Sequence, residues 1–236
     1  MTQFLASVSN LDEAMLAMEM GVDIIDLKNP IKGALGALSP EAIHDIVAAI
    51  DGRAILSATV GDLPMQPERI MFAVEHTSRL GIDIVKVGFF GASSHRECIA
   101  AMQAHASQGV RMVAVLFADQ APDFGLLSHL HDAGFNGVML DTVTKDGRGL
   151  LDHLPPTRLA AFVELAEAYR FQVGLAGSLK IADIPVLAAL KPDFLGFRGA
   201  LCEKLERTRA MSKKSLKEVK MVLQESNKMH GYAGRA

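Results

Sequence analysis

The chain has 236 residues, half of them hydrophobic, and a formal net charge of -3. Its length allows a sizeable core, in one α/β barrel or in two small domains. The nearly balanced charge argues against a nucleic-acid binder and against a binder of anionic membranes, so we expect neither partner.

The two cysteines are too few for a disulfide framework and are typical of a reducing compartment. The first residues lack the features of a secretion signal. No apolar run approaches the roughly 18 residues that a membrane helix needs. We therefore expect a cytoplasmic protein.

The first strand–helix unit has clear boundaries. Residues 4–8 are predicted to form a short buried strand. A helix over 10–20 follows, with Asn10 as its N-cap and Glu13 at the capping-box position. Gly21 then ends the helix.

The second unit carries the first charged pair. Residues 23–28 alternate as a strand, with Asp26 and Lys28 on the same face as Ile24. Asn29 and Pro30 stop this strand, and a glycine-containing loop follows. Ser39 and Pro40 then begin the second helix.

Six further strand–helix units complete the chain. The predicted pairs are 54–60 with 67–80, 82–88 with 93–108, 111–117 with 124–133, 137–141 with 156–169, 171–176 with 180–190, and 194–197 with 212–228. The last residues are expected to fray.

Eight strands that alternate with eight helices through mostly short loops indicate a parallel sheet. The count and the length predict an α/β fold, a single (β/α)8 TIM barrel of the phosphate-binding type that spans residues 1–236. The even strands also repeat one frame, in which an acidic or amide residue at the third place precedes mostly aliphatic residues; glycine opens the first three copies, and the fourth, which starts at Lys191, is looser. The frames start at 21, 81, 134 and 191, and each spacing equals two units, which supports the barrel.

Charged residues recur at matching places in this frame. Lys86 corresponds to Asp26, whereas Asp141 and Arg198 correspond to Lys28. In a barrel the catalytic face lies at the C-terminal ends of the strands, so we expect these side chains to meet at one mouth. A network of purely structural ion pairs is the alternative explanation.

Two lysines in a partly dry pocket indicate carbonyl chemistry. Burial or a second cation lowers the pKa of a lysine, and the neutral amine can attack a carbonyl to form a Schiff base. Asp26 and Asp141 could orient the lysines or move protons. Lys145 follows Asp141 in the next loop and could reach inward, or it could be an ordinary loop lysine.

Phosphate binding is expected after the last two strands. Gly177-Ser178 and Gly199-Ala200 follow them, where barrels often hold phosphate with backbone N–H groups. Ser7 and Arg198 are further candidates for contact with substrate or phosphate. The chain has no metal-ligand spacing and no dinucleotide fingerprint, so we expect neither a metal nor a cofactor.

Four segments resemble the (5-formylfuran-3-yl)methyl phosphate synthase family, which serves methanofuran biosynthesis. They are Leu-Ala-Ser-Val at 5–8, Asp-Ile-Ile-Asp-Leu-Lys-Asn-Pro at 23–30, Val-Lys-Val-Gly at 85–88 and Leu-Asp-Thr-Val-Thr-Lys-Asp-Gly at 140–147. The resemblance covers nearly the whole chain. It implies a carbon–oxygen lyase that condenses two molecules of glyceraldehyde 3-phosphate, with loss of phosphate and water.

The resemblance also implies a role for each site residue. Lys28 would form the Schiff base and Lys86 would accept a proton. Asp26, Asp141 and Lys145 would assist, and the two glycine loops would hold phosphate. We expect an enamine on Lys28 to attack the aldehyde of the second triose, with phosphate eliminated afterwards.

Other functions remain open on the sequence. The chain could be another class I (Schiff-base) aldolase, or a cofactor-free isomerase that acts on sugar phosphates. A non-catalytic protein that binds a phosphorylated metabolite is the third alternative. A homo-oligomer is compatible with each of them.

Overall fold

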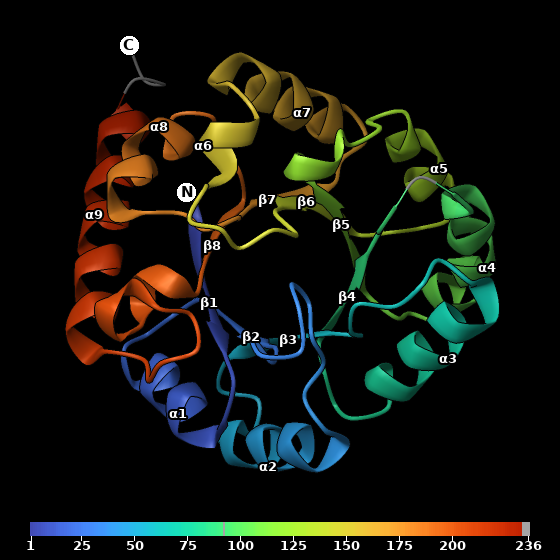
Figure 1. The fold of residues 1–236 in the computed structure, drawn as a ribbon, viewed down its shortest axis with the longest axis horizontal. Helices are drawn as coiled ribbons and strands as arrows, with labels where there is room; N and C mark the ends of the chain where they lie inside the picture. The colour runs from blue at the N-terminus through green and yellow to red at the C-terminus, as the bar shows by residue number, and fades with distance from the viewer. Residues whose placement is uncertain (92, 233–236) are drawn as a thin grey trace.

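The computed structural model describes residues 1–91 and 93–232, which contain a closed barrel of eight parallel strands (Figure 1). The strands are β1 (Gln3–Val8), β2 (Ile24–Leu27), β3 (Ile55–Thr59), β4 (Ile84–Gly88), β5 (Met112–Phe117), β6 (Gly137–Asp141), β7 (Gln172–Leu175) and β8 (Phe194–Phe197). They pair in chain order, and β8 pairs with β1 to close the ring. The predicted (β/α)8 barrel is confirmed.

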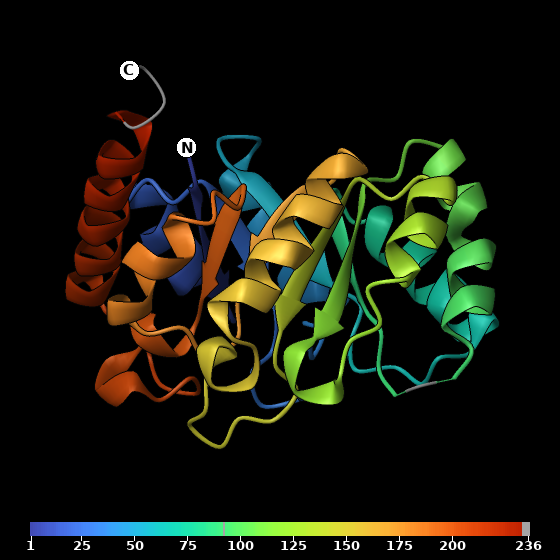
Figure 2. The same cartoon turned by 90° about the horizontal axis from the view of Figure 1, so that it is seen from above.

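The helices surround the barrel (Figures 1 and 2). They are α1 (Leu11–Glu19), α2 (Pro40–Ile50), α3 (Pro67–Ser78), α4 (His95–Ser107), α5 (Leu126–Asp132), α6 (Leu150–His153), α7 (Pro156–Ala168), α8 (Ile184–Ala188) and α9 (Lys213–Tyr232). In the described part of the chain, no helix is both long enough and apolar enough to cross a membrane.

Two helix predictions need correction. The helix expected over 180–190 is a 3-10 turn, η2 (Ile181–Asp183), followed by the short α8. Pro185 lies in the first turn of α8, where its fixed φ favours a helix start. The last helix continues to Tyr232 instead of ending near residue 228. The tail expected to fray beyond it, 233–236, lies outside the described residues.

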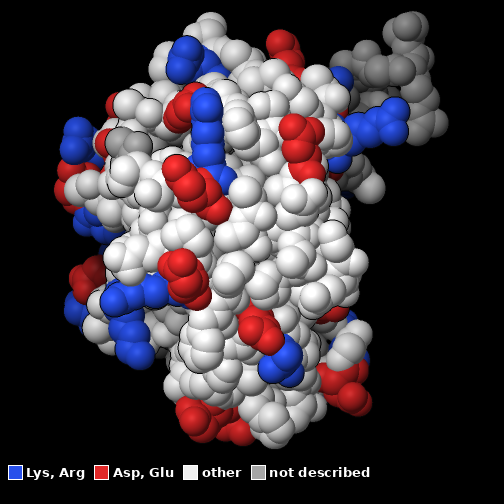
Figure 3. All heavy atoms as spheres, turned by 90° about the vertical axis from the view of Figure 1, so that its right-hand side faces the viewer, with Lys and Arg blue, Asp and Glu red and all other residues white. Residues whose placement is uncertain are grey.

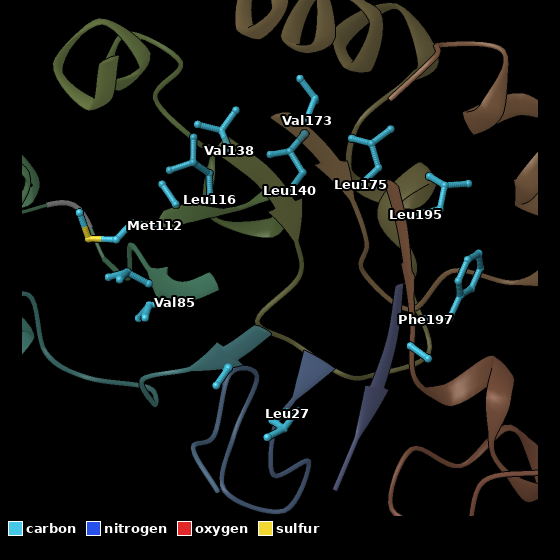
Figure 4. Packing of buried hydrophobic residues seen from close by; sticks show 14 of the residues in the cluster. Leu27, Val85, Met112, Leu116, Val138, Leu140, Val173, Leu175, Leu195 and Phe197 are labelled. Atoms are coloured by element: carbon cyan, nitrogen blue, oxygen red, sulfur yellow. The ribbon is translucent and has the colours of Figure 1, made fainter. Parts of the chain in front are cut away.

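Alternate side chains of each strand face two different cores. Leu27, Val85 and Leu140 point outward to the helices, together with the other labelled residues of Figure 4. The inward-facing core is smaller, and it includes Ile24 and Met139. This alternation places Asp26, Lys28, Lys86 and Asp141 inside the barrel, as the strand pattern predicted.

The loop after β2 enters the mouth of the barrel, where Figure 1 shows it within the ring of strands. Leu35 at its centre is fully buried in the inner core. The carboxylate of Asp62 fixes the loop, because it accepts hydrogen bonds from the amides of Ala34 and Leu35 at 2.8 and 2.6 Å. Gly33 has a φ of +131°, and a Cβ there would lie 2.0 Å from Oδ2 of Asp62. Only glycine fits this position.

The outer surface carries charges of both signs. On the face drawn in Figure 3, basic and acidic side chains are interspersed, and neither sign forms a large patch. This distribution agrees with the small net charge of the chain.

Candidate active site

A cavity of about 600 Å³ opens among the C-terminal ends of the strands. It contains ten of the predicted site residues: Ser7, Lys28, Lys86, Asp141, Lys145, Gly177, Ser178, Arg198, Gly199 and Ala200. Asp26, the remaining predicted residue, lies fully buried and contacts Lys86. The structure therefore brings the whole predicted set to one place.

Asp26 is held by neighbours in the same row of the sheet. The strand register places Ser7 and Ser57 beside it, on β1 and β3. The hydroxyl of Ser7 donates to Oδ2 at 2.9 Å, and that of Ser57 donates to Oδ1 at 2.7 Å. Burial raises the pKa of Asp26, but the charges of Lys86 and Lys28 and the Ser57 bond outweigh it, so its pKa is lowered. Asp26 is therefore a fixed anion.

Lys86 reaches the same carboxylate from β4. Its Nζ lies 3.0 Å from Oδ1 of Asp26, and the side chain is almost fully buried. Burial and the charge of Lys28 lower the pKa of Lys86, while Asp26 and Asp141 act in the opposite direction. Because the pKa of Lys86 is lowered overall, a larger fraction of its amine is neutral at a given pH than in an exposed lysine. Lys86 can therefore serve as a proton acceptor.

Asp141 joins the two other lysines. Its Oδ1 lies 3.0 Å from Nζ of Lys145 and its Oδ2 lies 3.6 Å from Nζ of Lys28. Lys145 also donates to the hydroxyl of Thr142 at 3.0 Å. Burial raises the pKa of Asp141, but the two lysines and the amide of Thr142 outweigh this effect and lower it. Lys145 thus reaches inward, and Asp141 stays ionised.

The three lysines differ in how tightly the protein holds them. Lys86 and Lys145 each lie 3.0 Å from a carboxylate oxygen. For Lys28, the carboxylate contact among the described residues is the longer one, at 3.6 Å to Asp141. Its amine faces the cavity, and the ammonium group has three N–H donors, more than this one contact uses. Lys28 is therefore the lysine best placed to bond to a ligand.

The turn after β7 presents free backbone donors. Within residues 1–91 and 93–232, the amides of Gly177, Ser178 and Leu179 donate no hydrogen bond to the protein backbone. Gly177 and Ser178 have φ values of +108° and +49°, so the chain is sharply turned here. The 3-10 turn η3 (Gly199–Leu201) brings two more N–H groups, at its N-terminus, to the same cavity. Backbone amides grouped in this way can bind an anion.

Arg198 lies where it was expected, but its guanidinium is fully engaged. It forms an ion pair with both carboxylate oxygens of Glu13. Its remaining N–H groups donate to the backbone oxygens of Ser7, Arg207 and Arg209, at 3.1, 2.7 and 3.3 Å. All five N–H groups thus have protein acceptors. While these contacts hold, the side chain has no donor for a phosphate.

Some residues of the site, among them Ser57, Thr142 and Arg207, were not predicted from the sequence. Ser57 donates to Asp26 from the middle of the predicted strand 54–60, where a polar residue on the inward face is a usable signal. Thr142 directly follows the predicted strand 137–141, and its amide donates to Asp141. Arg207 also lines the cavity. It lies between β8 and α9, in a stretch without strand or helix periodicity, so no sequence signal identified it.

The described residues contain no group of three or more His, Cys, Asp or Glu side chains that could hold a metal ion. The arrangement suits chemistry by amines and carboxylates on an anionic, carbonyl-containing ligand.

Comparison with known proteins gives a consistent result. The family described as 4-HFC-P synthase matches residues 4–220. A relative from Methylorubrum extorquens, provisionally named (5-formylfuran-3-yl)methyl phosphate synthase, is 42% identical over 209 residues, which cover 89% of this chain and 86% of the relative. The enzyme of that name from Methanococcus maripaludis strain C5 is 37% identical over 235 residues, with 94% and 99% coverage.

The fold has known counterparts as well. Phosphoribosyl anthranilate isomerase from Thermus thermophilus superposes with a TM-score of 0.67 at 17% sequence identity, covering 95% of this chain and 99% of the isomerase. At this identity the similarity concerns the barrel alone.

Proposed function

Because the chain belongs to the 4-HFC-P synthase family, we propose that it makes (5-formylfuran-3-yl)methyl phosphate from two molecules of glyceraldehyde 3-phosphate. The reaction proceeds through a Schiff base on Lys28 and serves methanofuran biosynthesis. One observation carries the proposal. Three lysines and Asp141 line one cavity, with Asp26 buried against Lys86, beside backbone amides that suit phosphate.

The first step is isomerisation to dihydroxyacetone phosphate. It moves a proton between neighbouring carbons and so needs a base near neutrality. Lys86 is that base, because its pKa is lowered and Asp26 fixes its amine. Lys28, in contrast, acts as the nucleophile. It attacks the ketone carbon, and one water leaves as the iminium forms.

Phosphate elimination follows on Lys28. A base removes a proton from the hydroxymethyl carbon, which gives an enamine with an adjoining hydroxyl. The hydroxyl then gives up its proton and becomes an aldehyde. The carbon–carbon double bond shifts to the terminal carbon, and the carbon–oxygen bond to phosphate breaks with its electron pair. The triose left on Lys28 is an enamine conjugated to an aldehyde.

The terminal carbon of this enamine attacks the ketone carbon of a second dihydroxyacetone phosphate. The product name requires this bond, because the ring carbon that bears the phosphorylated branch is the middle carbon of the triose that keeps its phosphate. The proposed order therefore differs from the one expected on the sequence. Attack on an aldehyde before phosphate leaves would join the trioses end to end, without a branch.

Ring closure completes the reaction. The free hydroxymethyl oxygen attacks the iminium carbon, the Lys28 amine leaves, and loss of a second water gives the aromatic ring. Two triose phosphates thus yield one furan phosphate, one phosphate and two waters, so that the atoms balance. Asp141 and Lys145, which are hydrogen-bonded beside Lys28, supply and collect protons in these steps.

Incubation of the purified protein with glyceraldehyde 3-phosphate alone tests the proposal. We expect a furan chromophore, the product mass and one phosphate released per furan. A reversible aldol adduct without released phosphate would instead indicate a class I aldolase. Interconversion of the triose phosphates alone would indicate an isomerase, and binding without turnover would indicate a binding protein. Each of these three results would overturn the proposal.

A further inference from the structure

Arg207 lines the same cavity and differs from Arg198 in its contacts. It is half-buried, and one terminal N–H donates to the backbone oxygen of Gly33 at 2.8 Å. Within the described residues this is the hydrogen bond that its guanidinium makes, so four of its five N–H groups have no protein acceptor. Since Gly33 belongs to the loop that follows Lys28, the bond brings the guanidinium to that part of the mouth.

Contacts within the protein hold the loop that carries Arg207. Cys202 and Met211 pair across its base. Nε of Arg198 donates to the backbone oxygen of Arg207 at 2.7 Å. Lys204 and Leu205 both have left-handed backbone angles, with φ of 56° and 60°. Such strained positions persist only where surrounding contacts enforce them, and they concentrate at ligand-binding loops.

The charges around Arg207 leave room for an anion. Burial lowers the pKa of Arg207, against the opposing effect of Asp141, but a guanidinium keeps its proton at physiological pH. The cavity is lined by more basic than acidic side chains: Lys28, Lys86, Lys145, Lys180, Arg198 and Arg207 against Asp141 and Glu206. Such a lining favours an anionic ligand.

We propose that Arg207 binds the phosphate that is eliminated from the triose attached to Lys28. The inference rests on the proposed function, in which two phosphates enter one cavity. The amides after β7 and β8 suit the phosphate that is retained. The departing phosphate gains negative charge as its carbon–oxygen bond breaks. The planar guanidinium fork offers two parallel donors to that charge.

Borohydride trapping with the mass of the trapped adduct tests this directly. The wild type, Arg207→Met and Arg207→Lys are each mixed with glyceraldehyde 3-phosphate, reduced and digested. Arg209→Met is the matched control, because Arg209 lies in the same loop but pairs with Glu206 and does not line the cavity. Thermal unfolding of each variant shows whether it is folded.

In Arg207→Met we expect an adduct on Lys28 that still carries phosphate, and furan formation about 10²-fold slower or more. Arg207→Lys should recover only part of this loss, since an ammonium lacks the fork. Arg209→Met should behave as the wild type.

Two results would overturn the inference. Accumulation of the dephosphorylated adduct in Arg207→Met would mean that the residue serves the second triose. Wild-type rates and adducts in Arg207→Met would mean that it binds neither phosphate. Failure of the proposed function itself is distinguishable, because the wild type would then give no adduct on Lys28 and no furan.

Discussion

Lys28 and Asp141 project from opposite sides of the barrel, β2 and β6, and their Nζ and Oδ2 atoms lie 3.6 Å apart across its mouth. This contact is longer than the 3.0 Å contacts that hold Lys86 and Lys145. A carboxylate thus orients the Lys28 amine without fully occupying it. The proposed chemistry depends on that difference.

Substitution of Lys28 by arginine should abolish turnover. The guanidinium keeps the charge opposite Asp141 but cannot form an iminium. We expect furan formation to fall by about 10³-fold or more, with little change in thermal unfolding. Lys32→Arg, in the exposed part of the following loop, is the control and should keep full activity. A Lys28→Arg protein with near wild-type activity would contradict the Schiff-base mechanism.

Removal of the Asp26 charge should destabilise the fold. Asp26→Asn leaves Lys86 buried without its anion, and breaking a buried ion pair in this way costs about 3–5 kcal/mol. Ser57→Ala removes one hydrogen bond to the same carboxylate and should cost about 1–3 kcal/mol. Urea unfolding measures both. Equal losses in the two variants would show that the charge pairing is not what matters here.

The isomerisation step should depend on pH through Lys86. A base works in its unprotonated form, so the rate should rise with pH through the pKa of Lys86, which lies below the ordinary lysine value. Asp26 raises that pKa, and Asp26→Asn should therefore move the rise to lower pH. The measurement is kcat/KM for triose phosphate interconversion against pH. Asp45→Asn, on the exposed face of α2, should leave the profile unchanged, and a shift to higher pH in Asp26→Asn would contradict the assignment.

Arg198 should matter first for stability. Arg198→Met leaves Glu13 as a buried, unpaired carboxylate, which we expect to cost about 3–5 kcal/mol. The double variant Glu13→Gln with Arg198→Met should lose less than the sum of the two single variants, because the residues are coupled. Arg79→Met breaks an exposed pair with Glu75 and should cost less than about 1 kcal/mol. Full stability of Arg198→Met would contradict this structural role.

Gly177 should be needed for phosphate binding. An added Cβ would lie 3.0 Å from Cγ2 of Thr142 at a φ of +108°, so Gly177→Ala must shift the turn and lose about 1–3 kcal/mol of stability. We expect inorganic phosphate to bind about tenfold more weakly, measured by calorimetry, which is about 1.4 kcal/mol. Gly109→Ala has a similar φ of +87° with open space around it, and Gly109 does not line the cavity. It should lose stability but not phosphate affinity.

The part of the site that lies on the strands could be predicted from the sequence, because strand periodicity shows which side chains face inward. The frame that repeats around the barrel placed Asp26, Lys28, Lys86 and Asp141 on inward faces, and the structure confirms those positions. A parallel barrel fixes where such side chains go, because alternate residues must face inward at the same end of every strand.

For Arg198, strand periodicity predicted the position of the residue but not its contacts. Its position at the end of β8 was predicted, but its partner Glu13 was expected to act in a capping box. The two residues are 185 positions apart, and only the closure of β8 onto β1 brings them together. Arg207 was not predicted, because it lies in an irregular loop whose conformation depends on these long-range contacts.

The central claim is that Lys28 forms the covalent bond to the triose. Reduction of the wild-type protein with borohydride during turnover of glyceraldehyde 3-phosphate, followed by peptide mass mapping, tests it most directly. We predict a three-carbon adduct on the peptide that contains Lys28, and none on Lys86 or Lys145. An adduct on either of those lysines, or no adduct while furan is formed, would contradict it.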